Sequence, residues 1–194
     1  MASADTVDAI ALLKADHRKV EDLFSKYESA KGASRKQTLA KQICTELTVH
    51  TIIEEEIFYP ACKGAVEEDL VAEAYVEHDG AKVLISEILN SAPDEEFYDA
   101  KVKVLQEQIE HHVEEEEKRS EGMFAQAKKG GLDMDALGEQ MAARKKELMA
   151  EFKTSDLPPP ETRSFTGHQL EQGHPVDEEP EAGAESAQQP PAGV

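Results

Sequence analysis

The sequence predicts an all-α protein: an up-down-up-down four-helix bundle, followed by an additional C-terminal helix and a disordered tail. Two observations support this fold class. Apolar residues recur every three or four positions along several long segments that Gly or Pro residues separate, and no segment alternates as a β-strand does. The composition, 39% hydrophobic but only 5% aromatic with no Trp, is typical of a helical bundle.

The first two helices are separated by a glycine. The first is expected over about residues 5–30 and ends before Gly32. Ser34 is a suitable N-cap for the second helix, because its hydroxyl can accept a hydrogen bond from a free backbone N–H. The apolar stripe of the second helix continues to Tyr59-Pro60, and the helix ends there or shortly after, at Gly64.

Three further helices follow. The third is expected over about residues 66–90, before a turn that contains Pro93. The fourth extends from about residue 94 to residue 129 and stops at Gly130-Gly131. The fifth spans about residues 134–152 and is amphipathic, so it needs a surface to cover, either an open flank of the bundle or a second subunit.

Composition divides the chain into three parts. Residues 1–130 form the bundle, and residues 131–153 hold the C-terminal helix that packs on it. Residues 154–194 are rich in Pro, Glu and Gln and hold 8 acidic residues against 1 basic residue. Such a segment has too few large apolar side chains to offset its ordering entropy, so we expect it to be disordered.

The net charge of −20 argues against nucleic acid and against anionic membrane surfaces as partners. No run of 18 apolar residues and no signal-peptide pattern is found, so we expect neither a membrane span nor export. Cys44 and Cys62 lie on one predicted helix about 27 Å apart at about 1.5 Å per residue, so they cannot pair within it. We interpret both as reduced packing residues, which points to the cytoplasm.

Two short motifs place a histidine and a glutamate one helical turn apart, His50 with Glu54 and His112 with Glu116. Both pairs lie on the apolar stripe of their helix, so they point into the core. Burying such pairs is costly unless something compensates them, and a bound metal ion would do so. His111 points sideways and is expected at the surface or behind the site.

His17 and His78 lie on the apolar stripes of the first and third helices, as His50 and His112 do on the second and fourth. Every long bundle helix therefore places one histidine on its inward face. Each of the four lies 14 to 19 residues from the adjoining turn, so an antiparallel bundle brings them to about one level. Imidazole and carboxylate together suit iron, manganese or zinc. The alternative is that each histidine is an ordinary core residue and that the glutamate runs are solvated.

Ferritin-like bundles, which use Glu-x-x-His on two helices, do not fit. The residues three positions before the inward histidines of the last three bundle helices are Leu47, Tyr75 and Ile109.

The histidine pattern, together with Phe58-Tyr59-Pro60 after the second-helix motif, resembles the hemerythrin, or HHE cation-binding, family over about residues 5–130. The resemblance implies a non-haem di-iron centre with an oxo or hydroxo bridge, terminal histidine ligands and two bridging glutamates. Carried over by position, the metal ligands would be His17, His50, Glu54, His78, His112 and Glu116.

This chain departs from the oxygen-carrying members, which have two histidines one turn apart on the third helix. Positions 74 and 82 here are Ala and Lys, and Glu117 stands where those members have an aspartate. A site richer in carboxylate favours ferric iron over reversible oxygen release. We therefore expect a protein that binds or senses oxygen, nitric oxide or iron in a stress response. The alternatives are a di-iron enzyme that acts on peroxide or in oxidative or nitrosative stress repair, and a metal-free acidic scaffold.

Overall fold

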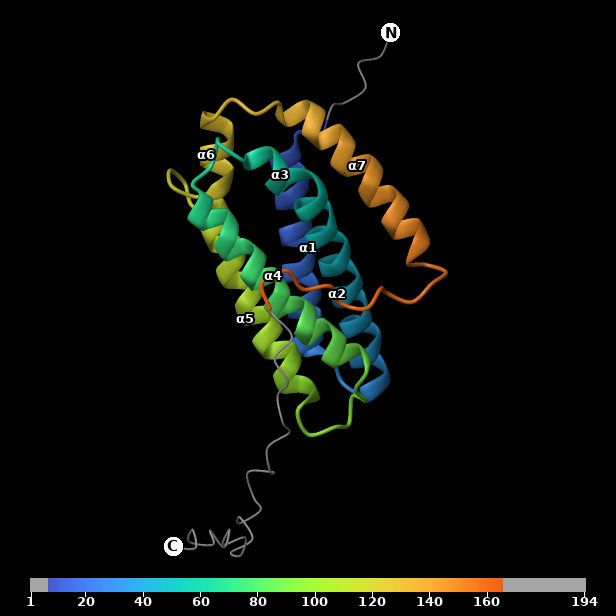
Figure 1. The fold of residues 1–194 in the computed structure, drawn as a ribbon. Coiled ribbons are helices and arrows are strands. Elements are labelled where there is room, and N and C mark those ends of the chain that lie inside the picture. The colour runs from blue at the N-terminus through green and yellow to red at the C-terminus, as the bar shows by residue number, and fades with distance from the viewer. Residues whose placement is uncertain (1–6, 166–194) are drawn as a thin grey trace, which may run out of the picture.

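The computed structural model describes residues 7–165, whose long helices form a four-helix bundle with one further helix on its flank (Figure 1). The bundle helices are α1 (Ala9–Ser29), α2 (Ala33–Ile53), α4 (Glu68–Leu89) and α5 (Tyr98–Glu117). Short connections make successive helices antiparallel, which is the up-down-up-down arrangement. The predicted all-α bundle is confirmed.

The start of α1 is fixed by Asp8, whose carboxylate accepts a hydrogen bond from the backbone N–H of Ala11 at 2.9 Å. Residues 5 and 6, where this helix was expected to begin, lie outside the described residues. Helix α2 begins at Ala33 with Gly32 in the cap position, so Ser34, the expected N-cap, lies within its first turn.

The second bundle helix is not continuous. After α2 the chain forms one π-helical segment, η1 (Glu54–Phe58), and then a short helix, α3 (Tyr59–Cys62). A π turn holds an extra residue, which rotates the following side chains by about 100° relative to a regular helix. Glu54 and Glu55, neighbours in the sequence, are both buried.

The predicted fourth helix is also interrupted: α5 ends at Glu117, and α6 (Met123–Lys129) follows a short loop. The run Glu114 to Glu117 places four carboxylates at a helix C-terminus, where the helix dipole disfavours negative charge. The loop after α5 then packs closely against the last turn of that helix. A Cβ atom on Gly122 would lie 2.6 Å from the carbonyl oxygen of Glu115, so this position requires glycine.

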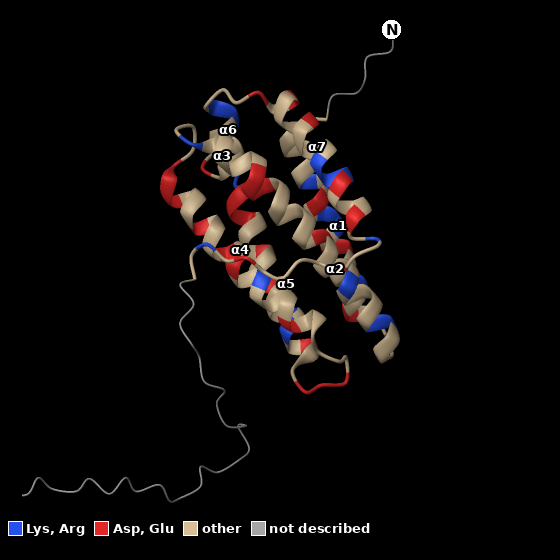
Figure 2. Ribbon diagram, turned by 45° about the vertical axis from the view of Figure 1, so that its right-hand side comes forward, with Lys and Arg blue, Asp and Glu red and all other residues tan. Residues whose placement is uncertain are grey.

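Helix α7 (Met134–Glu151) lies along α1, α2 and η1 (Figure 1). Its own side chains Met141 and Leu148 are buried against the bundle. Gly138 allows α7 to approach the start of α1, because a Cβ atom at this position would overlap the carbonyl group of Val7. Figure 2 shows basic residues of α7 beside the bundle; Arg144 pairs with Glu56 of η1 at 2.7 Å. The amphipathic helix therefore covers a flank of its own bundle.

The chain after α7 turns back across α2 and ends against α4, as the orange segment in Figure 1 shows. Residues 154–165 were expected to belong to a disordered tail. Arg163 and Ser164 instead hydrogen-bond to the buried carboxylate of Asp79. The segment buries little apolar surface and is held instead by these polar contacts. Residues 166–194 of the predicted tail lie outside the described residues.

The hydrophobic core consists of two clusters of buried side chains, each of which draws on all four bundle helices or the elements that extend them. The first includes residues of α6 and α7, and the second lies towards the turns near Gly32 and Pro93. Among residues 7–165, no helix has the length and apolarity needed to cross a bilayer.

Candidate metal centre

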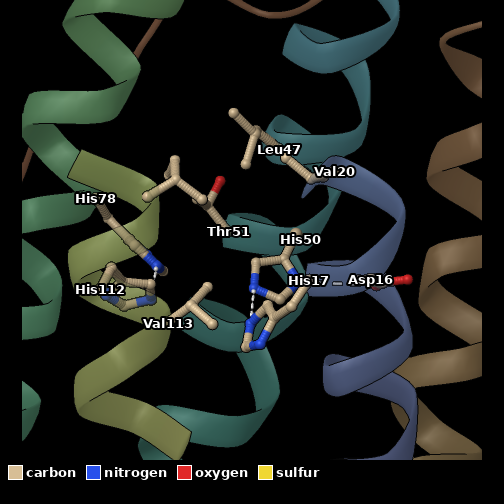
Figure 3. A pocket seen from close by; sticks show the side chains of 10 residues that line it. Asp16, His17, Val20, Leu47, His50, Thr51, His78, His112 and Val113 are labelled. Atoms are coloured by element: carbon tan, nitrogen blue, oxygen red, sulfur yellow. Dashed lines mark hydrogen bonds and ion pairs between the residues drawn. The ribbon is translucent and has the colours of Figure 1, made fainter. Parts of the chain in front are cut away.

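The four inward histidines meet at one level of the bundle, one from each bundle helix (Figure 3). Their exposed fractions are 3% for His17, 5% for His50, 1% for His78 and 2% for His112. The depth predicted from the turn positions is therefore correct. His111, expected beside the site rather than in it, has a side chain that is 61% exposed.

The histidines form two pairs. The Nε2 atoms of His17 and His50 are 3.2 Å apart, and those of His78 and His112 are 3.3 Å apart. In Figure 3 the rings of each pair point toward one another across the interior of the bundle. Two Nε2 atoms at this distance can serve as neighbouring ligands of one metal ion.

Two fully buried glutamates complete the cluster. One carboxylate oxygen of Glu54 lies 3.1 Å from His50 Nε2 and 3.3 Å from His78 Nε2, and so reaches both pairs. The oxygens of Glu116 lie 3.4 Å from His17 Nε2 and 3.6 Å from His112 Nε2, and so also reach both pairs. All six residues predicted from the sequence are thus brought together.

The donor atoms divide into two groups that could each hold a cation, within which all atoms lie inside 4.8 Å of one another. One contains His17, His50, Glu54 and Glu116, and the other contains Glu54, His78 and His112. Glu54 belongs to both groups. Glu54 therefore lies between the two groups.

The hydrogen bonding of the cluster fits metal ions. Within the described residues, Glu54 Oε1 and Glu116 Oε2 are buried and have no hydrogen-bond partner. Buried carboxylate oxygens are normally paired, so two such atoms facing one cluster need a partner of another kind. Imidazole nitrogen and carboxylate oxygen are suitable donors for iron, manganese or zinc.

Tyr59 is a further functional candidate, in addition to the six ligands predicted from the sequence. Its hydroxyl lies 3.1 Å from His78 Nε2, 3.2 Å from Glu116 Oε1 and 3.4 Å from Glu54 Oε2, at the centre of the cluster. Burial, with the negative charges of Glu116 and Glu54, raises its pKa well above 10. The side chain is therefore a neutral phenol in the metal-free protein. Tyr59 follows Glu54 by five residues, a spacing that faces the same way only across a π turn.

A second carboxylate lies behind each histidine, at its Nδ1 atom. The distances are 2.8 Å from His17 to Glu117, 3.7 Å from His50 to Asp16, 3.1 Å from His78 to Glu55 and 2.7 Å from His112 to Glu77. An ionised carboxylate only accepts hydrogen bonds, so at the three short distances the proton lies on Nδ1 and Nε2 faces the cluster.

These outer carboxylates form a closed ring around the bundle. Each is the sequence neighbour of a candidate ligand, and each faces the histidine of the next bundle helix. The pairs run from Asp16 on α1 to His50, from Glu55 on η1 to His78, from Glu77 on α4 to His112, and from Glu117 on α5 back to His17. The signal available in the sequence was one carboxylate on each bundle helix, directly next to an inward ligand: Asp16 next to His17, Glu55 next to Glu54, Glu77 next to His78 and Glu117 next to Glu116.

The carboxylates also determine the charge of the histidines in the metal-free protein. Burial acts to lower the pKa of His50, but Glu54 and Asp16 outweigh it and raise the pKa to about 10. Burial likewise opposes protonation of His112, and Glu116 and Glu77 raise its pKa to about 9. Metal ions would therefore have to displace protons from these rings.

Comparison with known proteins agrees with this geometry. The model of the hemerythrin HHE cation-binding domain matches residues 8–124. The crystal structure of a hemerythrin HHE cation-binding domain-containing protein from Mycobacterium kansasii resembles this chain with a TM-score of 0.64 and 26% sequence identity, covering 76% of this chain and 93% of that one.

A curated relative named DNA nickase, from a Nostoc species, is 29% identical over 106 residues, which are 55% of this chain and 30% of the relative. This chain thus matches less than a third of the relative's length. The nickase name describes that longer protein. With a family model that matches most of the bundle and all six predicted residues gathered at its centre, the chain belongs to the hemerythrin HHE cation-binding domain family.

Proposed function

We propose that this chain is a non-haem di-iron protein of the hemerythrin type. The observation that carries the proposal is the division of the six donor residues into two groups that share Glu54. His17, His50, His78 and His112 would be terminal ligands, and Glu54 and Glu116 would bridge the two ions. When bound, the iron pair would supply redox chemistry and open coordination positions for a small ligand.

We further propose that the small ligand is oxygen, nitric oxide or peroxide, or that iron itself is the signal, in a cytoplasmic stress response. A cavity of about 10 Å³ lies among the histidines, and Val20, Leu47, Ile109 and Val113 supply its apolar walls. That space suits about one water-sized molecule and excludes an organic substrate. Cys44 and Cys62 are buried free thiols, which supports a reducing compartment. The charge of −20 opposes contact with a DNA backbone, so we propose no nucleic-acid partner.

The second candidate is an enzyme that acts on peroxide. The Tyr59 hydroxyl favours it, because a neutral phenol at the centre of the cluster can donate a proton to a small ligand held there.

The experiment that separates the two candidates uses the iron-loaded protein. In the first arm, nitric oxide is titrated anaerobically into the ferrous form, and we expect an optical change that saturates near one ligand per centre. In the second arm, hydrogen peroxide is added and its concentration is followed. Continued removal of many equivalents would assign an enzyme, and the absence of both responses would contradict the proposed function.

A further inference from the structure

The last described part of the chain, residues 157–165, forms a strap that ends directly behind the candidate metal centre (Figure 1). After α7 the strap crosses α2 and reaches α4, where the Lys82 ammonium donates a hydrogen bond to the carbonyl oxygen of Glu161 at 3.1 Å. The hemerythrin motifs do not include these residues.

Asp79 anchors the strap. Its side chain is 0% exposed, and its Oδ2 atom accepts hydrogen bonds from the backbone N–H of Arg163 at 2.8 Å and from both the backbone N–H and the hydroxyl of Ser164, at 2.6 and 2.7 Å. Burial acts to raise the pKa of Asp79, but the bonds from Ser164 and Arg163 outweigh it and lower the pKa. The strap is therefore docked by specific, charge-assisted hydrogen bonds.

Arg163 continues from this anchor to the metal centre. Its Nε donates to Glu55 Oε2 at 3.2 Å, and its guanidinium lies 5.5 Å from the centre of the Tyr75 ring. The other oxygen of Glu55 faces Nδ1 of His78 at 3.1 Å. A chain of two polar contacts thus joins a side chain of the strap to a candidate metal ligand.

The two oxygens of Glu55 have different partners. Oε1 receives both His78 Nδ1 and the Lys82 ammonium, at 3.1 and 2.6 Å, while Arg163 holds Oε2. His78 and Lys82 both contact Oε1, so neither of them holds the second oxygen of the carboxylate. Arg163 fixes the second oxygen and, with it, the direction in which Glu55 faces the histidine.

We propose that Arg163 is a positioning residue for the metal centre, acting on His78 through Glu55, so that docking of the strap and metal binding favour each other. The inference rests on the proposed metal-binding function. Outer carboxylates that orient ligating histidines are commonly worth about 10- to 100-fold in metal affinity. Because coupling between two sites is reciprocal, bound metal must stabilise the docked strap by the factor that the docked strap adds to metal affinity.

The test compares three variants of the full chain. Arg163→Ala removes the contact to Glu55, and Arg163→Lys retains a positive charge that can partly replace it. Arg144→Ala is the matched control, because Arg144 holds Glu56 on the same π turn at 2.7 Å, and Glu56 contacts no histidine. Each protein is titrated anaerobically with Co²⁺, whose visible absorption reports both occupancy and ligand geometry.

We expect Arg163→Ala to weaken one of the two Co²⁺ binding steps by about five- to tenfold and to alter the visible spectrum of that step. Arg163→Lys should recover part of the affinity, and Arg144→Ala should stay within about twofold of the natural protein. In the natural protein, added Co²⁺ should slow hydrogen exchange at the backbone amides of Arg163 and Ser164 by a similar factor.

Equal affinity and an unchanged spectrum in Arg163→Ala would overturn the inference, as would strap amides that exchange at the same rate with and without metal. A loss of thermal stability that is equal in the metal-free and metal-bound forms would show a merely structural strap and would also overturn it. If the natural protein binds no Co²⁺ and no iron, the proposed function fails instead, so the two failures are distinguishable.

Discussion

Glu77 on α4 accepts a hydrogen bond from Nδ1 of His112 on α5 at 2.7 Å, which is the shortest of the four contacts between an inward histidine and its outer carboxylate. The bond leaves Nε2 of His112 facing the cluster. Glu77 thereby orients a candidate ligand on the neighbouring helix, and it keeps the proton on Nδ1 when a metal ion displaces the one on Nε2.

Replacing Glu77 with Gln should weaken metal binding by about 10- to 100-fold, because an amide is a weaker acceptor and can present its N–H₂ group to the ring. Competition with a chelator of known affinity measures the change. Glu115→Gln is the control, because Glu115 lies 3.6 Å from the exposed His111 and contacts no inward histidine. Equal affinities of the two variants would show that the outer ring does not orient the histidines.

The neighbouring histidines of α5 should behave in opposite ways. His112→Ala removes a buried member of the second donor group and should lose at least one of two bound irons, whereas His111→Ala, at a side chain that is 61% exposed, should keep both. Iron analysis after gel filtration measures this. The opposite ranking would show that α5 is rotated from the orientation described.

The metal-free protein should lose stability as the pH rises. In the folded protein the pKa is raised to about 10 for His50 and to about 9 for His112. Both side chains therefore stay protonated at pH values above about 6.5, where an ordinary histidine has lost its proton. Their stabilising contribution is complete below about pH 6.5 and disappears as the pH approaches 10. Urea unfolding in a chelator should give a free energy of unfolding lower by a few kcal/mol at pH 9.5 than at pH 7. A flat profile would contradict the charge assignment.

Truncation after Gly130 should promote aggregation, because it removes α7 and exposes the apolar surface of the bundle that α7 covers. The α7 side chains Met141 and Leu148, which are 0% and 3% exposed, pack against that surface. Truncation after Phe165 is the control, since it keeps every described residue of the C-terminal region, and it should leave metal content and thermal stability nearly unchanged. Light scattering and thermal melting measure both. A shorter protein that stays monomeric and equally stable would show that α7 is an appendage.

The bundle and its six central residues could be predicted because they follow regular helical spacing. His50 and Glu54, like His112 and Glu116, are one turn apart on an apolar stripe, and the turns near Gly32 and Pro93 fix their depth. These signals are local, and antiparallel packing then brings them together without further information.

The remaining features depend on departures from that regularity. Glu55 lies off the apolar stripe of its helix, so the apolar pattern does not reveal that it faces His78 from the π turn of η1. The break after Glu117 arises from accumulated negative charge at a helix end and a close approach at Gly122, neither of which alters the apolar pattern. The strap is held by Asp79 through polar contacts between residues 84 and 85 positions apart, which no local pattern reveals.

Metal stoichiometry tests the central claim most directly. The metal-free protein is reconstituted anaerobically with ferrous iron, excess iron is removed, and iron and protein are quantified before and after exposure to air. The two donor groups that share Glu54 predict close to two irons per chain, and a ferric pair that absorbs in the near ultraviolet after oxidation. A single tightly bound zinc in the purified protein that iron does not replace, or no retained iron, would contradict the di-iron centre.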